Sequence, residues 1–242
     1  MHHFLIALQF LTRLPVRLAR VPSAEETGRS LLTYPLVGAL IGGLLLLLST
    51  LLHAGDAWLQ AALLLVVWVA LSGALHLDGL ADSADAFLGG HGDRPRTLSI
   101  MKDPRTGPMG VVAVVLLLLI KLVALAAALR AQQWSVVLWA PVVGRTALIG
   151  LFLTTPYVRT QGLGRALADH LPRHEAGWVL ALVALMLPLA LGWPGLKTLA
   201  LIFFLAWLLR WWMMRILGGT TGDTAGAMVE LIEAACLLAL VW

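Results

Sequence analysis

Long apolar stretches separated by short polar segments dominate the pattern of side chains along this chain. Seven stretches are apolar almost throughout, at residues 36–52, 58–75, 111–129, 134–153, 178–191, 196–217 and 227–242. A helix needs about 20 apolar residues to cross a bilayer, and these stretches have or approach that length. The pattern predicts an all-α fold: a polytopic membrane helical bundle of about seven transmembrane helices, with residues 1–242 as a single domain. The last stretch is short, which leaves open whether it crosses the bilayer fully or in part.

A shorter apolar segment begins the chain. Phe4, Leu8 and Leu11 fall on one face of a helix, and arginines follow from Arg13 onward. Such an amphipathic segment is typical of a helix that lies in the membrane–water interface. We therefore expect an interfacial N-terminal helix ahead of the first transmembrane helix.

Composition strengthens the membrane assignment. Hydrophobic residues make up 60% of the chain and charged residues 12%, with a mean hydropathy of +0.89. Soluble domains usually carry about 25% charged residues. The net charge is +4, but no five like charges are consecutive, which argues against nucleic acid as a partner. The basic residues instead suit lipid head groups of the bilayer or phosphorylated substrates. A single cysteine, Cys236, excludes a disulfide framework and a cysteine metal site.

Basic residues are concentrated in alternate connections between the apolar stretches. The segments rich in them contain Arg13, Arg17, Arg20 and Arg29; Arg94, Arg96, Lys102 and Arg105; and Arg159, Arg165 and Arg173. Arg210 and Arg215 fall near the junction of the last two stretches. The other connections carry only Arg130 and Lys197. The positive-inside rule therefore places the N-terminus and the basic loops in the cytoplasm, with seven spans leaving the C-terminus outside.

A group of carboxylates follows the second apolar stretch, in LHLDGLADSADAF. Asp78, Asp82 and Asp85 are spaced i, i+4 and i+7, which puts them within roughly a 60° arc of one helix face. Carboxylates near a membrane are costly unless they face water, a partner or a metal. Because Mg²⁺ prefers oxygen ligands and shares its shell with phosphates, these residues are candidate magnesium ligands. The alternative is a solvated helix end whose three acids have no common role.

A second acidic cluster lies near the C-terminus, in GGTTGDTAGAMVELIE. Asp223 and Glu230 are seven residues apart and share a helix face, and Glu233 follows them. Thr220 and Thr221 are positioned to cap this helix or to contact phosphate. If the two acidic clusters face each other, they could hold two metal ions for an in-line displacement. The alternative is that Glu230 and Glu233 pair with a nearby arginine.

Basic side chains complete the candidate site. The loop MKDPRTGPMG contributes Lys102 and Arg105 on either side of Asp103, and PYVRTQGLG contributes Arg159. Arg145 lies inside an apolar stretch, where an unpaired charge is expensive, so we expect it to face the carboxylates or a substrate phosphate. Arginine and lysine suit phosphate oxygens as a fork and as a point charge. The alternative for the two loops is an ordinary basic, solvated connection.

Acids for Mg²⁺ and cations for phosphate in a membrane point to phosphoryl-group chemistry. The chain has no GxxxxGK[ST] segment, which excludes a P-loop NTPase. It also has no evident Ser/His/Asp or Cys/His nucleophile set. Direct attack by an alcohol on a metal-bound pyrophosphate needs neither, because positioning and charge neutralisation carry most of such catalysis.

Four segments carry a family resemblance: LHLDGLADSADAF, MKDPRTGPMGV, GRTALIGLFLTTPYVRTQGLG and GGTTGDTAGAMVE. Together with QFLTRLPV and YPLVGALIGG near the N-terminus, they resemble the cobalamin synthases, the adenosylcobinamide-GDP ribazoletransferases, over nearly the whole chain. The chain departs from the family pattern at Ala86, where glycine is usual, and at Pro104 and Pro108. These changes affect the shape of the loop and leave the charged groups in place.

The resemblance implies an activity. In that family, adenosylcobinamide-GDP and α-ribazole, or its 5′-phosphate, give adenosylcobalamin, or its phosphate, and GMP. It also implies dependence on Mg²⁺, a bacterial inner-membrane location and contact with other late cobalamin-biosynthesis enzymes, and it leaves a homo-oligomer open. On this basis we expect three groups of residues: Asp78, Asp82, Asp85, Asp223 and Glu230 as metal ligands; Asp82, Asp85, Lys102 and Arg105 in catalysis; and Asp103, Arg145, Arg159 and Thr221 in substrate binding.

Two other functions remain open at this point. Asp82-Ser83-Ala84-Asp85 also resembles the opening of the CDP-alcohol phosphotransferase signature, although the full signature is missing. Such a lipid synthase would release CMP from a CDP-lipid. A small transporter could instead use Arg145 and the acids as an ion path, but the chain has no obvious inverted repeat.

Overall fold

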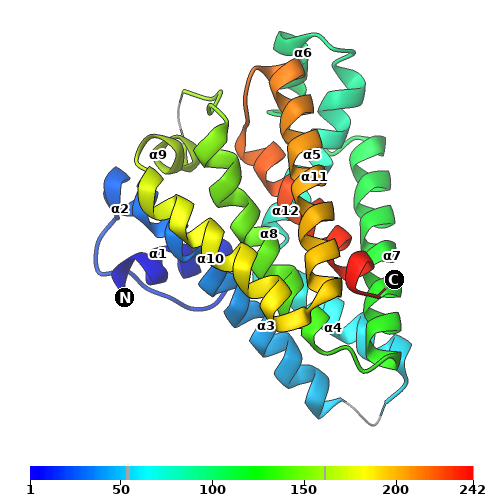
Figure 1. Ribbon diagram of the computed structural model, residues 1–242. Coiled ribbons are helices and arrows are strands. Elements are labelled where there is room, and N and C mark those ends of the chain that lie inside the picture. The colour runs from blue at the N-terminus through cyan, green and yellow to red at the C-terminus, as the bar shows by residue number, and fades with distance from the viewer. Residues whose placement is uncertain (53–54, 161, 242) are drawn as a thin grey trace.

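The protein is almost entirely helical. The computed structural model describes residues 1–52, 55–160 and 162–241, and Figure 1 shows their arrangement. The helices are α1 (His2–Leu11), α2 (Ala24–Ser30), the 3₁₀ helix η1 (Leu31–Thr33), α3 (Tyr34–Leu51), α4 (Ala57–Ser72), α5 (Leu75–Gly89), α6 (Arg94–Ile100), α7 (Pro108–Arg130), α8 (Ser135–Thr154), α9 (Leu163–Asp169), α10 (Arg173–Leu191), α11 (Trp193–Leu217) and α12 (Gly222–Val241).

Among the residues that the structure describes, six helical segments are long and apolar enough to cross a membrane. They are the continuous segment Ala24–Leu51, α7, α8, α10, α11 and α12. The helices α4 and α5 pass the same test only as a pair, and they are bent by 88° relative to each other. The expected all-α, multi-span fold is therefore confirmed. The second predicted stretch, 58–75, is a helix that ends at Ser72, and the acidic motif lies on a separate helix.

Two residues in the left-handed conformation produce the bend between α4 and α5. Gly73 has a φ of 61° and Ala74 a φ of 57°. Residues that have a Cβ adopt this backbone conformation only at a cost in free energy. The N-terminal segment supports this turn, because the Arg13 N–H donates to Leu71 O at 2.8 Å. The Arg13 side chain also packs against Gly73, where an added Cβ would overlap it. The bend turns α5 out of line with α4.

Small residues allow α3 and α8 to pack closely. An added Cβ would lie 2.5 Å from Pro141 O at Gly38 and 2.7 Å from Leu138 O at Gly42. Both distances are too short for any larger residue, so this GxxxG pair lets the two backbones touch, as in other membrane helix pairs.

Helix α12 is central, whereas α10 and α11 lie at the periphery. In its most apolar window, α12 is 72% buried, compared with 11% for α10 and for α11. It packs against α5, α7, α8 and α11. It begins at Gly222, earlier than the predicted residue 227, and so includes Asp223; the predicted end, Trp242, lies outside the described residues.

The N-terminal helix packs on the bundle. Leu8 and Leu11 of α1 are buried and the partly buried Phe4 joins the same core, so the predicted apolar face exists. Helix α1 contacts α2 and α3, and α2 contacts α9. These short helices gather on one side of the molecule, while α5 and α6 lie on another (Figure 1).

Candidate functional site

The crossing of α5 and α12 brings the two acidic motifs together. An added Cβ at Gly79 would lie 2.7 Å from Asp223 O and 3.0 Å from Asp223 Cα. On the facing helix, an added Cβ at Gly226 would lie 3.3 Å from His76. Because the two backbones approach this closely, side chains of α5 that flank the crossing lie next to side chains of α12. Segments almost 150 residues apart in the chain thus form one site.

Three carboxylates meet at this crossing. Asp82 lies within electrostatic range of Asp78 and Asp223, and more weakly of Asp85. Asp223 in turn interacts with Asp78. Asp78 is exposed, and Asp82 and Asp223 are partly buried. Like charges held this close repel one another, so the arrangement favours a cation beside them.

Arg159 is the cation that the protein itself supplies to this cluster. Its Nη2 donates to Asp223 Oδ2 at 2.5 Å, and the Arg159 and Asp223 side chains are 27% and 17% exposed. A short bridge holds the segment before Arg159: the Val158 N–H donates to Thr220 O, and the Thr220 N–H donates to Pro156 O, both at 2.9 Å. Arg159 is therefore fixed beside the start of α12.

Thr221 caps α12, which is one of the two roles that the sequence allows, whereas its expected role in substrate binding stays a prediction. Its Oγ1 accepts from the Thr224 N–H at 3.2 Å, and its own N–H donates to Thr224 Oγ1 at 2.9 Å. The hydroxyl also lies 3.4 Å from Asp223 Oδ2. Thr221 is fully buried, so this capping pair orients Asp223 without itself facing solvent.

A cavity of about 170 Å³ opens beside the carboxylates. Asp78, Asp223 and His76 contribute polar lining, and Phe10, Tyr34 and Phe152 contribute aromatic lining. Tyr157 lies close by, and burial raises the pKa of its phenol, although the positive charge of Arg159 opposes the shift. The phenol is therefore protonated at neutral pH.

The Asp85 carboxylate accepts hydrogen bonds from the N-terminal end of α7. Its Oδ2 accepts from the Gly107 N–H at 2.6 Å, and its Oδ1 accepts from the N–H groups of Met109 and Gly110 at 3.1 and 2.9 Å. These are the free donors at the start of α7, where a negative charge is favourable. Both carboxylate oxygens are therefore occupied by backbone donors, and Asp85 is left out of the metal ligands proposed below, although the sequence suggested it as one.

Glu230, Glu233 and Arg145 belong to a different cluster, inside the bundle. Lys121 Nζ lies 2.5 Å from Glu230 Oε2 and 2.5 Å from Glu233 Oε2, and Arg145 pairs with Glu233. All four side chains are 6% exposed or less. Glu230 lies about 10 Å further along α12 than Asp223. The expected roles of Glu230 as a metal ligand and Arg145 as a substrate contact therefore give way to a buried ion network.

The loop between α6 and α7 keeps its charges in solvent. Asp103 and Arg105 pair at 2.8 Å, and the Arg105 side chain is 86% exposed. The Arg105 guanidinium lowers the pKa of the Asp103 carboxyl to about 2. Lys102 is exposed and has no ion-pair partner among the described residues. The loop adjoins the site through Met101, whose carbonyl lies 3.5 Å from Arg159 Nη2.

The oxygen donors suit a hard divalent cation that substrate helps to bind. Within residues 1–52, 55–160 and 162–241, no three His, Cys, Asp or Glu side chains are arranged so that they could hold a metal ion by themselves. Mg²⁺ usually takes one or two carboxylates and completes its shell with water and substrate phosphates. The crowded carboxylates of Asp78, Asp82 and Asp223 fit that mode.

Comparison with known proteins identifies the family. The model of cobalamin-5-phosphate synthases matches residues 3–241. The chain belongs to the cobalamin-5-phosphate synthase family. It is also similar to adenosylcobinamide-GDP ribazoletransferase of Pseudomonas putida GB-1, with 61% identity over 237 residues, covering 98% of this chain and 97% of the relative.

Other relatives agree with this family assignment. The ribazoletransferase of Pseudomonas fluorescens Pf-5 is 61% identical over 97% of both chains. That of Pseudomonas syringae pv. syringae B728a is 58% identical over 98% of both. No solved structure matches the chain.

One charged residue that the structure places in the ion network was missed by sequence reasoning. Lys121 lies in the middle of the apolar stretch 111–129 and proves to be the partner of both buried glutamates. A lone lysine inside a predicted transmembrane helix is costly and implies a buried acidic partner, so the signal was present. Tyr157 gave no such signal, because nothing in the sequence shows that it pairs with residue 220.

Proposed function

We propose that this chain is an adenosylcobinamide-GDP ribazoletransferase. It transfers the adenosylcobinamide phosphate group from adenosylcobinamide-GDP to α-ribazole, or to α-ribazole 5′-phosphate, and releases GMP. The observation that carries the proposal is the meeting of Asp78 and Asp82 with Asp223 at the crossing of α5 and α12. This site lies in a chain that resembles ribazoletransferases over nearly its full length.

The acidic cluster is the proposed magnesium site. One or two carboxylates of the cluster formed by Asp78, Asp82 and Asp223 would hold the ion, with water and pyrophosphate oxygens completing its shell. Bound Mg²⁺ would neutralise negative charge on the pyrophosphate and on the departing GMP. Helix α5 carries two of these carboxylates and α12 the third, so the geometry depends on the packing of these two helices.

Cations beside the cluster bind the phosphates. Arg159 already faces Asp223, and its guanidinium can fork onto a phosphate oxygen when substrate enters. Lys102 and Arg105 lie on the neighbouring exposed loop and are proposed to contact the nucleotide, with Asp103 orienting Arg105. Arg145 has an indirect role here, because it holds Glu233 and so the position of α12.

The transfer step requires a base. We assign this role to Asp82, which is partly exposed and interacts with both other carboxylates. Asp82 accepts the proton from the ribose 3′-hydroxyl of α-ribazole, and that oxygen forms a bond to the cobinamide-side phosphorus. The bond from this phosphorus to the bridging oxygen breaks, and GMP leaves with the electron pair. The corrinoid is too large for a closed pocket, and it is expected to lie at the open face of the site.

The site is proposed to face the cytoplasm of a bacterial inner membrane. The loops that surround it carry Lys102, Arg105 and Arg159, in agreement with the positive-inside rule. Nucleotide and Mg²⁺ are available on that side. The lipid bilayer surrounds the transmembrane helices. Other late cobalamin-biosynthesis enzymes are the proposed protein partners.

A direct assay tests the function. Membranes that contain the protein are incubated with adenosylcobinamide-GDP, α-ribazole and Mg²⁺, and we expect GMP and adenosylcobalamin in equal amounts. Chelation of Mg²⁺ should stop the reaction, and added Mg²⁺ should restore it. CMP release from a CDP-lipid without corrinoid turnover would support a lipid synthase instead.

The variant Asp82→Asn tests the proposed base. Loss of a general base usually lowers turnover by about 10²- to 10⁴-fold, so we expect GMP release to fall by at least that lower limit while the protein stays folded. Asp169→Asn is the matched control, because Asp169 pairs with Arg165 on the surface of α9. GMP release at the wild-type rate by Asp82→Asn would remove Asp82 from the mechanism.

A further inference from the structure

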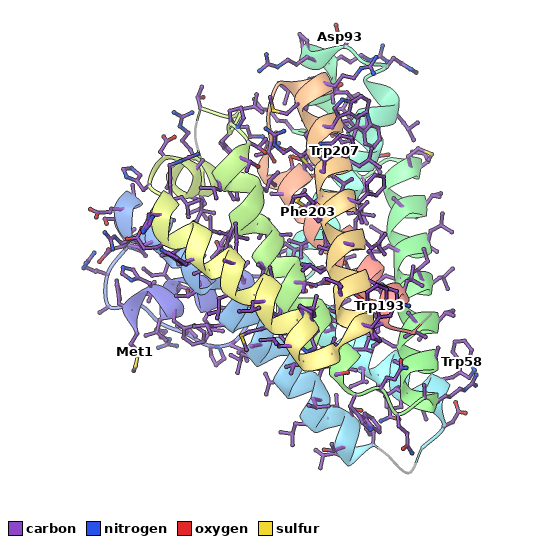
Figure 2. All side chains as sticks on the ribbon, viewed as in Figure 1. Met1, Trp58, Asp93, Trp193, Phe203 and Trp207 are labelled. Atoms are coloured by element: carbon purple, nitrogen blue, oxygen red, sulfur yellow. The ribbon has the colours of Figure 1, made fainter. Side chains whose placement is uncertain are left out.

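A large apolar groove lies on the membrane-facing side of the bundle, away from the carboxylates. It has a volume of about 610 Å³ and is formed by α8, α10 and α11 with Met228 of α12 at its floor. Phe203 and Trp207, one turn apart on α11 (Figure 2), line one wall. Apart from Thr146, Thr154 and Arg210, every lining side chain is apolar or glycine.

The groove has the length of one membrane leaflet. On α8 it extends from Val143 to Thr154, and on α11 from Leu199 to Arg210. Each span covers twelve residues, whose first and last members are about 16 Å apart along the helix axis. Half of the hydrocarbon core of a bilayer is about 15 Å thick. The groove can therefore hold an acyl chain that runs from the interface to the bilayer midplane.

Positive charge is confined to one end of the groove. Arg210 lines that end and donates to Thr154 O at 2.8 Å, while Arg173 donates to Leu153 O at 2.6 Å. Two guanidinium groups thus lie together at the end of α8. The next residue of α11, Trp211, stacks with Arg215, which is typical of the interface where lipid head groups lie.

We propose that this groove is a specific binding site for an anionic phospholipid. An acyl chain fills the apolar part, and the phosphate of the head group lies against Arg210 and Arg173. The two arginines use part of their donors on α8 carbonyls, which leaves each guanidinium with further N–H groups that can bind a phosphate. The lipid lies in the same leaflet as the acidic site, because the end of α8 leads directly into the segment that carries Arg159. This site is independent of the reaction proposed above.

Two glycines on neighbouring helices allow a matched test. An added Cβ at Gly150 would meet only Leu180 Cδ2, at 3.9 Å, so Gly150→Leu projects a side chain into the groove without a backbone clash. An added Cβ at Gly177 meets nothing within 4 Å, and Gly177 does not line the groove. Gly177→Leu is therefore the same change outside the proposed site.

Lipid retention is the measurement. The full-length protein is reconstituted into vesicles of phosphatidylethanolamine and phosphatidylglycerol in equal amounts, extracted into mild detergent and analysed by native mass spectrometry. We expect one phosphatidylglycerol to remain bound to the wild type and to Gly177→Leu, and to be lost from Gly150→Leu. Arg210→Gln should lower its retention about fivefold, the effect of one arginine near an anionic head group.

Two controls separate a specific site from general charge or misfolding. Arg210→Lys keeps the charge and should keep most of the lipid, while Arg215→Gln removes an exposed arginine outside the groove and should change little. Each variant is compared only where its helical content matches the wild type. Equal retention by Gly150→Leu and Gly177→Leu, no preference for phosphatidylglycerol, or a protein dimer without bound lipid would each overturn the proposal.

Discussion

Aspartates of one motif perform different tasks because their hydrogen-bond partners differ. Asp78 and Asp82 face other carboxylates and solvent. Asp85, one turn further along α5, is satisfied by three backbone N–H groups at the start of α7. Its role is to join α5 to α7, and through this contact it fixes the loop that carries Lys102 and Arg105.

The variant Asp85→Ala tests this assignment. Removing a charged acceptor from a helix end usually costs about 2 kcal/mol, so we expect a comparable loss in the free energy of unfolding, measured with a denaturing detergent. Asp85→Asn keeps one acceptor and should lose less. The Mg²⁺ concentration that gives half-maximal GMP release should not change in either variant. A large rise in that concentration would instead make Asp85 a ligand.

At the scale of the elements, the crossing of α5 and α12 determines the site. Gly79 and Gly226 let the backbones approach until Asp223 lies beside Asp78. The bend at Gly73 and Ala74 makes this possible, because a straight continuation of α4 would carry the acidic motif in a different direction. Catalytic geometry here depends on small residues that have no chemistry of their own.

The variant Gly79→Ala tests the importance of this crossing. The new methyl group would overlap the Asp223 backbone, and overpacking of this kind costs about 1–3 kcal/mol. We expect reduced stability and a strong fall in GMP release, because α12 must move away. The control is Gly43→Ala on α3, where an added Cβ meets nothing within 4 Å. It should be neutral, or stabilising by up to about 1 kcal/mol; equal effects of the two substitutions would contradict the packing argument.

At the scale of the whole molecule, a neutral ion network holds the bundle together. Lys121 of α7, Arg145 of α8, and Glu230 and Glu233 of α12 provide two positive and two negative charges in the interior. Lys121 also lies 4.7 Å from the centre of the Trp68 ring of α4. Four helices are thereby joined at one level. The polar end of the molecule, with Asp93, lies away from the end that carries Trp58 and Trp193 (Figure 2).

A double-mutant cycle tests the coupling within this network. Glu233→Gln leaves two buried cations with one anion, and breaking a buried pair usually costs about 3–5 kcal/mol. Arg145→Met should be similarly harmful. We expect the double variant to be more stable than the sum of the two effects predicts, by at least about 1 kcal/mol, because the Lys121–Glu230 pair remains balanced. Strict additivity in the unfolding free energies would show that the two residues act independently.

The sequence by itself determined the class of the fold and the family. Apolar stretches of membrane-spanning length predicted the six long helices, since the bilayer permits few alternatives, and the ordered motifs indicated the ribazoletransferases; both predictions are confirmed. The sequence also predicted that acids from its two ends meet, and Asp78, Asp82 and Asp223 do so. The chemical role of each residue stays a prediction.

Only the tertiary structure decided which charged residues face one another. Spacing places Asp85 with Asp82, and Glu230 with Asp223, because a helical repeat records only the face on which a side chain lies. Whether that face meets water, a helix end or a buried lysine depends on the neighbouring helices. Distant segments meet where Arg13 bonds to Leu71 beside the bend, where the N–H groups of α7 bond to Asp85, and where Lys121 pairs with two glutamates. No local pattern in the chain specifies which segments make these contacts.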